Sequence, residues 1–191
     1  MTSSPPCVLV VEDETELAEL FAEWLSEDYD VRVATSGEAA LERVDEDVDV
    51  VLLDRLMPGI SGDEVLERIR DRGLSVRVAM VTAVEPDFDV LELGFDDYVV
   101  KPLFREDIRR LVRGLLERDE YDRTLSDLFA AASKLAALDS HKTEEELAES
   151  EEYDRLRAEF ERARDRIDEL ESEMTEEDFE AVFYDFDRVD L

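Results

Sequence analysis

The sequence predicts an α/β domain built on a five-stranded parallel sheet with helices on both faces, followed by an all-α helical hairpin or coiled coil. Two observations support this class. In roughly the first 118 of the 191 residues, short apolar runs alternate five times with segments of helical period, which is typical of a doubly wound parallel sheet. Beyond that point single apolar residues recur at steps of three and four, the spacing of coiled coils.

The predicted strands are short apolar runs. Cys7–Val11 is apolar throughout, as expected of a strand buried on both faces of a sheet. The four later strands are expected at Val31–Ala34, Val48–Leu53, Val76–Val81 and Asp97–Val100. Residues 1–6, before the first strand, have nothing to bury and are predicted to be a disordered lead.

The predicted helices lie between these strands. Glu14–Glu27 comes first, because its apolar residues recur at the helical period and fall on one face. The others are expected at Gly37–Val44, Gly62–Arg72, Asp87–Leu93 and Arg105–Leu116. Five strand–helix pairs in this order complete a sheet domain over residues 7–118.

Charge and composition exclude several classes of protein. The chain carries 22 basic and 55 acidic residues, for a net charge of -33, so direct DNA binding is disfavoured. No stretch reaches the roughly 20 apolar residues that span a bilayer, so we expect a cytoplasmic protein without a membrane partner. Only three of the basic residues are lysines, a composition associated with proteins of salt-loving microbes.

Polar residues follow the predicted strands at their carboxyl ends. They are Glu12, Asp13, Asp54, Thr82 and Lys101. Because the loops that leave the carboxyl ends of parallel strands form the ligand crevice in such sheets, we expect these three carboxylates, the hydroxyl and the ammonium to converge.

The chemistry of such a cluster points to a divalent metal and phosphoryl transfer. Three close carboxylates repel one another unless a cation compensates them, and oxygen ligands with open positions suit Mg²⁺. Transfer to a carboxylate needs a nucleophile and fixed donors for the phosphoryl oxygens. Asp54 is positioned as the nucleophile, with Lys101 and Thr82 as the donors.

Four motifs resemble the receiver domain of two-component response regulators. They are VLVVEDE at 8–14, VLLDRLMPGISG at 51–62, MVTA at 80–83 and DDYVVKP at 96–102. The resemblance implies a flavodoxin-like fold and a phosphoprotein that receives its phosphoryl group from a sensor histidine kinase. It also implies that the protein is not an enzyme beyond self-phosphorylation and dephosphorylation.

The resemblance also implies a role for each matching residue. Asp54 would be the phosphoacceptor and Lys101 would pair with the phosphoryl group. The Mg²⁺ ligands would be Glu12, Asp13, Asp54 and the backbone carbonyl of Leu56. Thr82 and Tyr98 would form the switch pair, and Pro102 would follow a cis peptide bond. No site for an organic cofactor is implied. Arg55 and Phe95 depart from the residues usual at their positions.

The segment from 119 to 191 is predicted to be a helical domain, with a hairpin over 119–174 and a short helix over 176–186. Its first arm can continue from Arg105–Leu116. One apolar seam consists of Tyr121, Leu125, Leu128, Ala132 and Leu135, and a second of Leu156, Phe160, Ala163, Ile167, Leu170 and Met174. A polar turn is expected at Asp139–Lys142, and Thr143 with Glu146 forms a capping box that opens the second arm.

This helical segment resembles the HalX domain found after receivers in haloarchaeal regulators. EYDRTLSDLF at 120–129 and MTEEDFEAVFYDF at 174–186 carry the resemblance, which supplies no catalytic motif. The only histidine, His141, falls in the expected turn, which argues against a phosphorelay role because a relay histidine projects from the middle of a helix.

We therefore expect a response regulator that changes its partner contacts on phosphorylation, through the face built from Asp87–Leu93, Tyr98 and Arg105–Leu116. A phosphorylation-regulated transcription regulator and an aspartyl-phosphate phosphatase are the alternatives. A phosphatase of that kind needs an acidic residue two positions after its nucleophile, where this chain has Leu56. A flavin-binding carrier is disfavoured by the acidic loop after the first strand. Homodimerisation through the coiled-coil seam or through the receiver face stays open, and the downstream protein partner is unspecified.

Overall fold

A five-stranded parallel sheet forms the centre of the first part of the chain, as the sequence predicts. The computed structural model describes residues 4–84 and 93–173. The strand order is β2-β1-β3-β4-β5, and each neighbouring pair is parallel. The bounds are Cys7–Val11 for β1, Asp30–Ala34 for β2, Val50–Leu53 for β3, Arg77–Thr82 for β4 and Asp97–Val100 for β5.

Six helices lie in the described part of the chain. They are α1 at Thr15–Leu25, α2 at Gly37–Arg43, α3 at Gly62–Asp71, α4 at Arg105–His141, α5 at Glu144–Ala148 and α6 at Glu151–Glu173. Apart from Leu93, the predicted helix at 87–93 lies outside the described residues, as do the lead at 1–3 and the helix at 176–186. None of the described helices combines the length and apolar character that crossing a bilayer requires.

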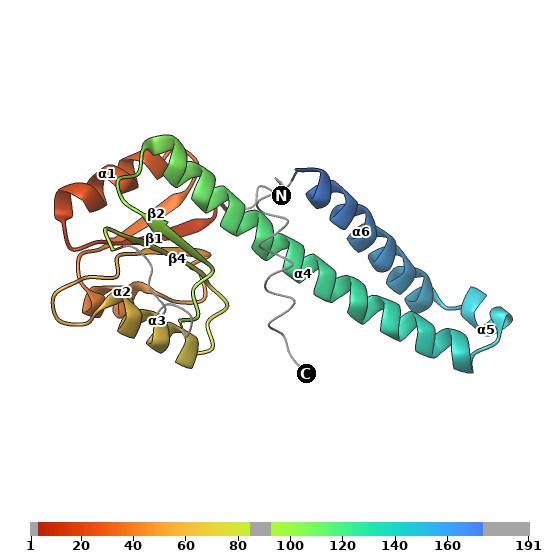
Figure 1. Cartoon of the computed structure of the whole chain (residues 1–191). Coiled ribbons are helices and arrows are strands. Elements are labelled where there is room, and N and C mark those ends of the chain that lie inside the picture. Colours follow the sequence, from red (N-terminus) through yellow and green to blue (C-terminus); the bar gives the residue numbers. More distant parts are fainter. Residues whose placement is uncertain (1–3, 85–92, 174–191) are drawn as a thin grey trace. The chain divides into compact units, whose positions relative to one another are not determined.

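Alternation along the strands sends successive side chains into two separate cores. In β1, Leu9 and Val11 join the core that contains α2 and α3, whereas Val8 and Val10 join the core that contains α1 and the first turns of α4. Figure 1 shows these two pairs of helices on opposite sides of the sheet. Because both faces are covered, the central strands β1 and β3 are apolar throughout, whereas the edge strand β2 carries Arg32 in its interior.

Serine caps fix the starts of α2 and α3. Ser36 accepts a hydrogen bond from the Ala39 amide, and Ser61 accepts one from the Glu64 amide. Each cap satisfies one of the amides that a helix N-terminus leaves without a partner. The first turn of α3 is thereby placed beside the end of β3.

Asp96 is the centre of a polar network at the start of β5. Its carboxylate accepts hydrogen bonds from Arg70 Nη2 at 2.8 Å, from Arg77 Nη1 at 2.9 Å and from the Val78 amide at 2.7 Å. Only 15% of this side chain is exposed. The carboxylate therefore ties α3 and β4 to the segment that leads into β5.

The second compact unit begins at Glu117 and contains the distal part of α4 together with α5 and α6. The two long helices pair in antiparallel fashion through polar contacts at both ends. These contacts are Glu120 with Arg166 at 2.7 Å, Tyr121 with Glu171 at 3.3 Å, and Asp139 with Tyr153 at 2.8 Å. The predicted helical hairpin is confirmed within residues 117–173.

The connection between the two arms differs from the prediction. Asp139–His141 are the last residues of α4 rather than a turn, because the stretch has neither glycine nor proline to end the helix. The predicted capping box of Thr143 and Glu146 is present, but it opens the five-residue helix α5. The second arm, α6, begins only at Glu151.

We expect Asp96→Ala to lower the free energy of unfolding of the sheet unit by about 3 kcal/mol, because it removes a largely buried carboxylate that two guanidinium groups and the Val78 amide contact. Urea unfolding followed by the fluorescence of Trp24, the only tryptophan, measures the change. Glu64→Gln removes an exposed carboxylate paired with Arg68 on α3 and is the control, with an expected loss below about 0.5 kcal/mol. Equal losses in the two variants would contradict the network's role.

We expect Leu170→Ala to weaken the hairpin selectively, because Leu170 is 1% exposed and packs with Tyr121 and Ile167. Removing a buried leucine side chain costs about 2 to 5 kcal/mol. The far-UV circular dichroism signal, which the long helices dominate, should melt earlier while the Trp24 transition stays in place. A shift of both transitions by the same amount would show that the two units unfold together.

Candidate functional site

The candidate site lies at the carboxyl ends of β1, β3, β4 and β5. Glu12 and Asp13 follow β1, Asp54 follows β3, Thr82 is the last residue of β4, and Lys101 follows β5. Parallel hydrogen bonds keep these ends in line: the Asp54 amide donates to the Val11 carbonyl, and the Lys101 amide to the Thr82 carbonyl. The sheet thus brings the five residues singled out from the sequence to one edge.

Lys101 holds two of the carboxylates together. Its Nζ donates to Glu12 Oε2 at 2.5 Å and to Asp54 Oδ2 at 2.7 Å. The three side chains are largely buried, with exposed fractions of 14% for Lys101, 3% for Glu12 and 10% for Asp54. The peptide bond between Lys101 and Pro102 is cis, as the resemblance implies.

Three carboxylates form a compact cluster at this edge, which we call the carboxylate cluster: Glu12, Asp13 and Asp54. One oxygen from each lies within 4.8 Å of the others. A single ammonium compensates at most one of three negative charges at such separations, so the cluster keeps a strong attraction for a further cation.

Glu12 shows most directly that the cluster is incomplete on its own. Its Oε1 is buried and has no hydrogen-bond partner among the described residues. Burial raises the pKa of Glu12, and the hydrogen bond from Lys101 opposes that shift only in part. Burial alone would lower the pKa of Lys101, but the hydrogen bonds to Asp54 and Glu12 outweigh it and raise the pKa. The ammonium is therefore charged, while the carboxylates still lack compensation.

A chain of polar contacts connects Thr82 to Tyr98. Thr82 is fully buried, and its Oγ1 accepts a long hydrogen bond from the Val84 amide at 3.4 Å. The Tyr98 hydroxyl donates to the Val84 carbonyl at 2.9 Å. Phe95, one of the two departures from the usual pattern, packs its ring 5.5 Å from that of Tyr98. Sequence reasoning named Thr82 and Tyr98 but missed the backbone of Val84 that joins them.

The start of α3 packs directly on the backbone beside Asp54. A Cβ atom at Gly62 would lie 2.2 Å from the Asp54 carbonyl oxygen and 2.8 Å from the Arg55 Cα, so only glycine fits. The Gly62 amide donates to the Arg55 carbonyl at 2.9 Å. Within the loop, the Leu56 amide donates to Asp54 Oδ1 at 3.2 Å, and the Leu56 side chain is 65% exposed.

Arg55, the other departure, has a partner that sequence reasoning missed. Its guanidinium forms a two-nitrogen fork with Asp63 on the first turn of α3, with contacts of 3.0 to 3.1 Å. The signal in the sequence is an acidic residue eight positions after an arginine, which alone does not predict a contact.

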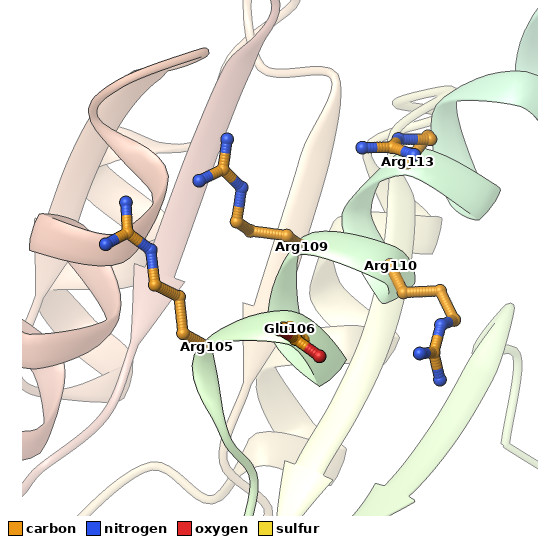
Figure 2. A pocket seen from close by; sticks show the side chains of 5 residues that line it. All are labelled: Arg105, Glu106, Arg109, Arg110 and Arg113. Atoms are coloured by element: carbon orange, nitrogen blue, oxygen red, sulfur yellow. The ribbon is translucent and has the colours of Figure 1, made fainter.

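A basic hollow lies on the first turns of α4. It has a volume of about 420 Å³ and is lined by Arg105, Glu106, Arg109, Arg110 and Arg113. Figure 2 shows Arg105 and Arg109 extending from one side of the helix and Arg110 from the other. Arg105 pairs with Glu27, and Arg109 pairs with both Glu27 and Asp28, which lie beyond the end of α1. Within the described residues, Arg110 and Arg113 are exposed and have no ion-pair partner.

Comparison with known proteins finds two family matches. The response regulator receiver domain matches residues 8–113, and the HalX domain matches residues 117–183. These two matched segments meet near the border between the two compact units at Leu116 and Glu117.

Similar proteins and structures agree with these matches. A Haloferax volcanii protein named provisionally as a transcriptional regulator is 50% identical over 139 residues, or 72% of this chain and 24% of that protein. The sensory transduction protein RegX3 of Mycobacterium tuberculosis is 43% identical over 126 residues, which cover 63% of this chain and 55% of RegX3. This chain thus spans a quarter to about half of these relatives.

Among solved structures, the response regulator protein TrrA from Thermotoga maritima, in complex with Mg²⁺ and a beryllium fluoride, has a TM-score of 0.52 and 35% identity. The match covers 58% of this chain and 99% of that one. The match therefore covers little more than half of this chain and nearly all of the other.

We expect Lys101→Met to destabilise the metal-free protein more at pH 8 than at pH 5. Removing the ammonium leaves buried carboxylates unpaired, at a cost of about 3 kcal/mol when they are charged. The pKa of Glu12 is already raised, and loss of Lys101 raises it further. When a group has a higher pKa in the folded state than in the unfolded state, the folded state loses stability as pH rises through that pKa. The loss of unfolding free energy caused by Lys101→Met is therefore smaller at low pH.

Urea unfolding in EDTA, followed by Trp24 fluorescence at the two pH values, tests this expectation. Lys142→Met, which removes an exposed lysine paired with Glu146, is the matched control. It should leave the free energy of unfolding unchanged at both pH values. If Lys101→Met lowered the free energy of unfolding equally at pH 5 and pH 8, the proposed role of the buried carboxylates would be contradicted.

Proposed function

The chain belongs to the response regulator receiver family, with a HalX domain after the receiver, and from this premise we propose that it accepts a phosphoryl group on Asp54. The observation that carries the proposal is the pairing of Asp54 Oδ2 with Lys101 Nζ at 2.7 Å inside the carboxylate cluster. We assign the receiver to residues 7–118 and the helical domain to residues 119–191.

Magnesium is the metal that the cluster fits. Glu12, Asp13 and Asp54 offer hard oxygen ligands, and the buried Glu12 Oε1 has no partner among the described residues. With the Leu56 carbonyl, these groups would hold the ion and leave positions for water and phosphoryl oxygens. When bound, the ion supplies positive charge that neutralises the entering phosphoryl group.

The chain's own residues would perform the transfer as follows. A carboxylate oxygen of Asp54 attacks the phosphorus of a phosphohistidine on a sensor kinase. The new oxygen–phosphorus bond forms as the phosphorus–nitrogen bond breaks, and the imidazole leaves with that electron pair. Lys101 then pairs with a phosphoryl oxygen, and Thr82 offers its hydroxyl as a hydrogen-bond donor.

The contacts around Thr82 suggest how acceptance would be signalled. When Thr82 turns toward the phosphoryl group, the Val84 amide loses its side-chain acceptor, and the Val84 carbonyl that holds the Tyr98 hydroxyl shifts with it. Tyr98 would then rotate and alter the surface around β5 and the first turns of α4. We propose that partners, and a second copy of the chain, read this surface.

The basic hollow on α4 supports a role in partner contact. Of its four arginines, Arg110 and Arg113 are exposed and have no ion-pair partner within the described residues, so they would favour partners with carboxylates at the matching positions. The downstream partner and the cytoplasmic location remain proposals of the same kind.

Transcriptional control is the second candidate, because the Haloferax volcanii relative is named provisionally as a transcriptional regulator. This chain corresponds to only 24% of that protein, and its net charge disfavours direct DNA binding. Phosphatase activity is less favoured, since Leu56 stands where that chemistry needs an acid. Control of transcription would therefore act through a partner protein.

We expect acetyl phosphate with Mg²⁺ to add one phosphoryl group to the full chain, and Asp54→Asn to abolish the adduct, because an amide cannot act as the nucleophile. Intact-protein mass spectrometry measures the product. Asp71→Asn, at the exposed end of α3, removes a carboxylate away from the cluster and should label like the parent. Labelling of Asp54→Asn at the parent's level would overturn the acceptor assignment.

A further inference from the structure

Phe129 lies on the distal part of α4, and its side chain is 63% exposed. Among the described residues of the hairpin unit, it is the only large apolar side chain that is exposed. One exposed phenylalanine needs no partner by itself. Its surroundings set it apart, because the helix face on which it lies carries no charge in a chain that is 40% charged residues.

This part of α4 presents what we call the uncharged face. It consists of Phe129 and of five exposed residues that follow one another at steps of four and three, the spacing at which two helices pack side by side. These five are Ser126, Ala130, Ser133, Ala137 and Ser140. On the other arm of the hairpin, by contrast, every exposed side chain described in α6 is charged, apart from Ser172. Of the two arms, α4 is therefore the one with a face that fits a further helix.

Two opposite charges border the uncharged face along one edge. Asp127 lies seven positions before Lys134, which is close to two helical turns, so the two side chains leave α4 in nearly the same direction. Both line one hollow of about 450 Å³ beside α6. Both are exposed, and neither has an ion-pair partner in the part of the chain that the structure describes. The edge thus offers one carboxylate and one ammonium to a partner.

We propose that the uncharged face binds the uncharged face of a second copy of this chain, with the two α4 helices antiparallel. A two-fold axis between the levels of Ala130 and Ala131 makes Asp127 of each copy level with Lys134 of the other. Residues at the same edge of two antiparallel helices face each other across the contact. The symmetry therefore forms two reciprocal ion pairs from a single pair of residues.

The same alignment accommodates the exposed ring. Phe129 of one copy comes within one residue of the level of Ser133 in the other copy, and the short serine side chain leaves room for the ring. A parallel pair would not bring Asp127 and Lys134 to one level. Charge complementarity therefore selects the antiparallel orientation.

The net charge of -33 on each copy opposes association everywhere except at such a face. Salt removes most of this repulsion, because the Debye length is about 3 Å at 1 M. Ion pairs in direct contact are within that length, whereas charges elsewhere on the two copies are not. The proposed dimer is independent of phosphoryl transfer, since it involves no residue of the carboxylate cluster.

Sedimentation equilibrium of the full, unphosphorylated chain in about 1 M KCl tests the proposal. We expect a monomer–dimer equilibrium in the micromolar range, because a contact through one helix face is limited in area. Asp127→Lys gives a chain with lysine at both edge positions, and Lys134→Asp gives one with aspartate at both. Each variant alone should raise the dissociation constant at least about tenfold, because like charges then face each other.

An equimolar mixture of these two variants is the decisive sample. We expect it to form dimers about as stable as those of the parent, because the lysines of one chain face the aspartates of the other. Restored association also shows that both variants are folded. Overall charge cannot explain weaker association of Asp127→Lys, since this substitution makes the chain less negative.

Asp168→Lys is the matched control, because it makes the same change of charge at an exposed position on α6; it should not weaken association. Phe129→Ala, which leaves the charge unchanged, should weaken it. A parent that stays monomeric at millimolar concentration overturns the inference, and the face then has another occupant, such as a different protein or the chain after Glu173. Single variants that dimerise like the parent, a mixture that stays monomeric, or an unchanged dissociation constant for Phe129→Ala would overturn it as well.

Discussion

The contact of one ammonium with two buried carboxylates organises the site. Lys101 reaches Glu12 and Asp54 from the end of β5, and this is possible only because the sheet aligns strands that are far apart in the sequence. The ammonium lowers the repulsion enough for the domain to fold around a negative cluster. It does not remove that repulsion, because Glu12 keeps a raised pKa and a buried oxygen without a partner among the described residues.

The same sheet explains why the polar side chains of the candidate site are confined to one edge. Strands covered on both faces cannot carry charged side chains in their interiors without large desolvation costs. The polar groups therefore gather where strands end, and small structural features adjust their positions there. Gly62 allows α3 to approach the Asp54 backbone, and the Asp63 carboxylate fixes the guanidinium of the next residue.

The sequence was sufficient for those parts of the structure that depend on burial or on strand order. Apolar runs predict the five strands, and the rule that crevices form at strand ends predicts the meeting of Glu12, Asp54 and Lys101. Contacts set by side-chain direction inside loops could not be predicted, such as the Arg55 fork or the role of the Val84 backbone. The prediction of a turn at Asp139–Lys142 is wrong because polar residues alone do not end a helix, and this stretch contains no helix-breaking residue.

Function and stability oppose each other at this site. A cluster fully compensated within the folded chain would be more stable, but it would have no affinity left for a dication or for a phosphoryl group. Positive charge supplied by the chain itself is limited at this site, because the one ammonium of Lys101 is shared between two carboxylates. The remaining negative charge destabilises the metal-free protein, and under the proposed function the same charge would provide free energy for binding a dication.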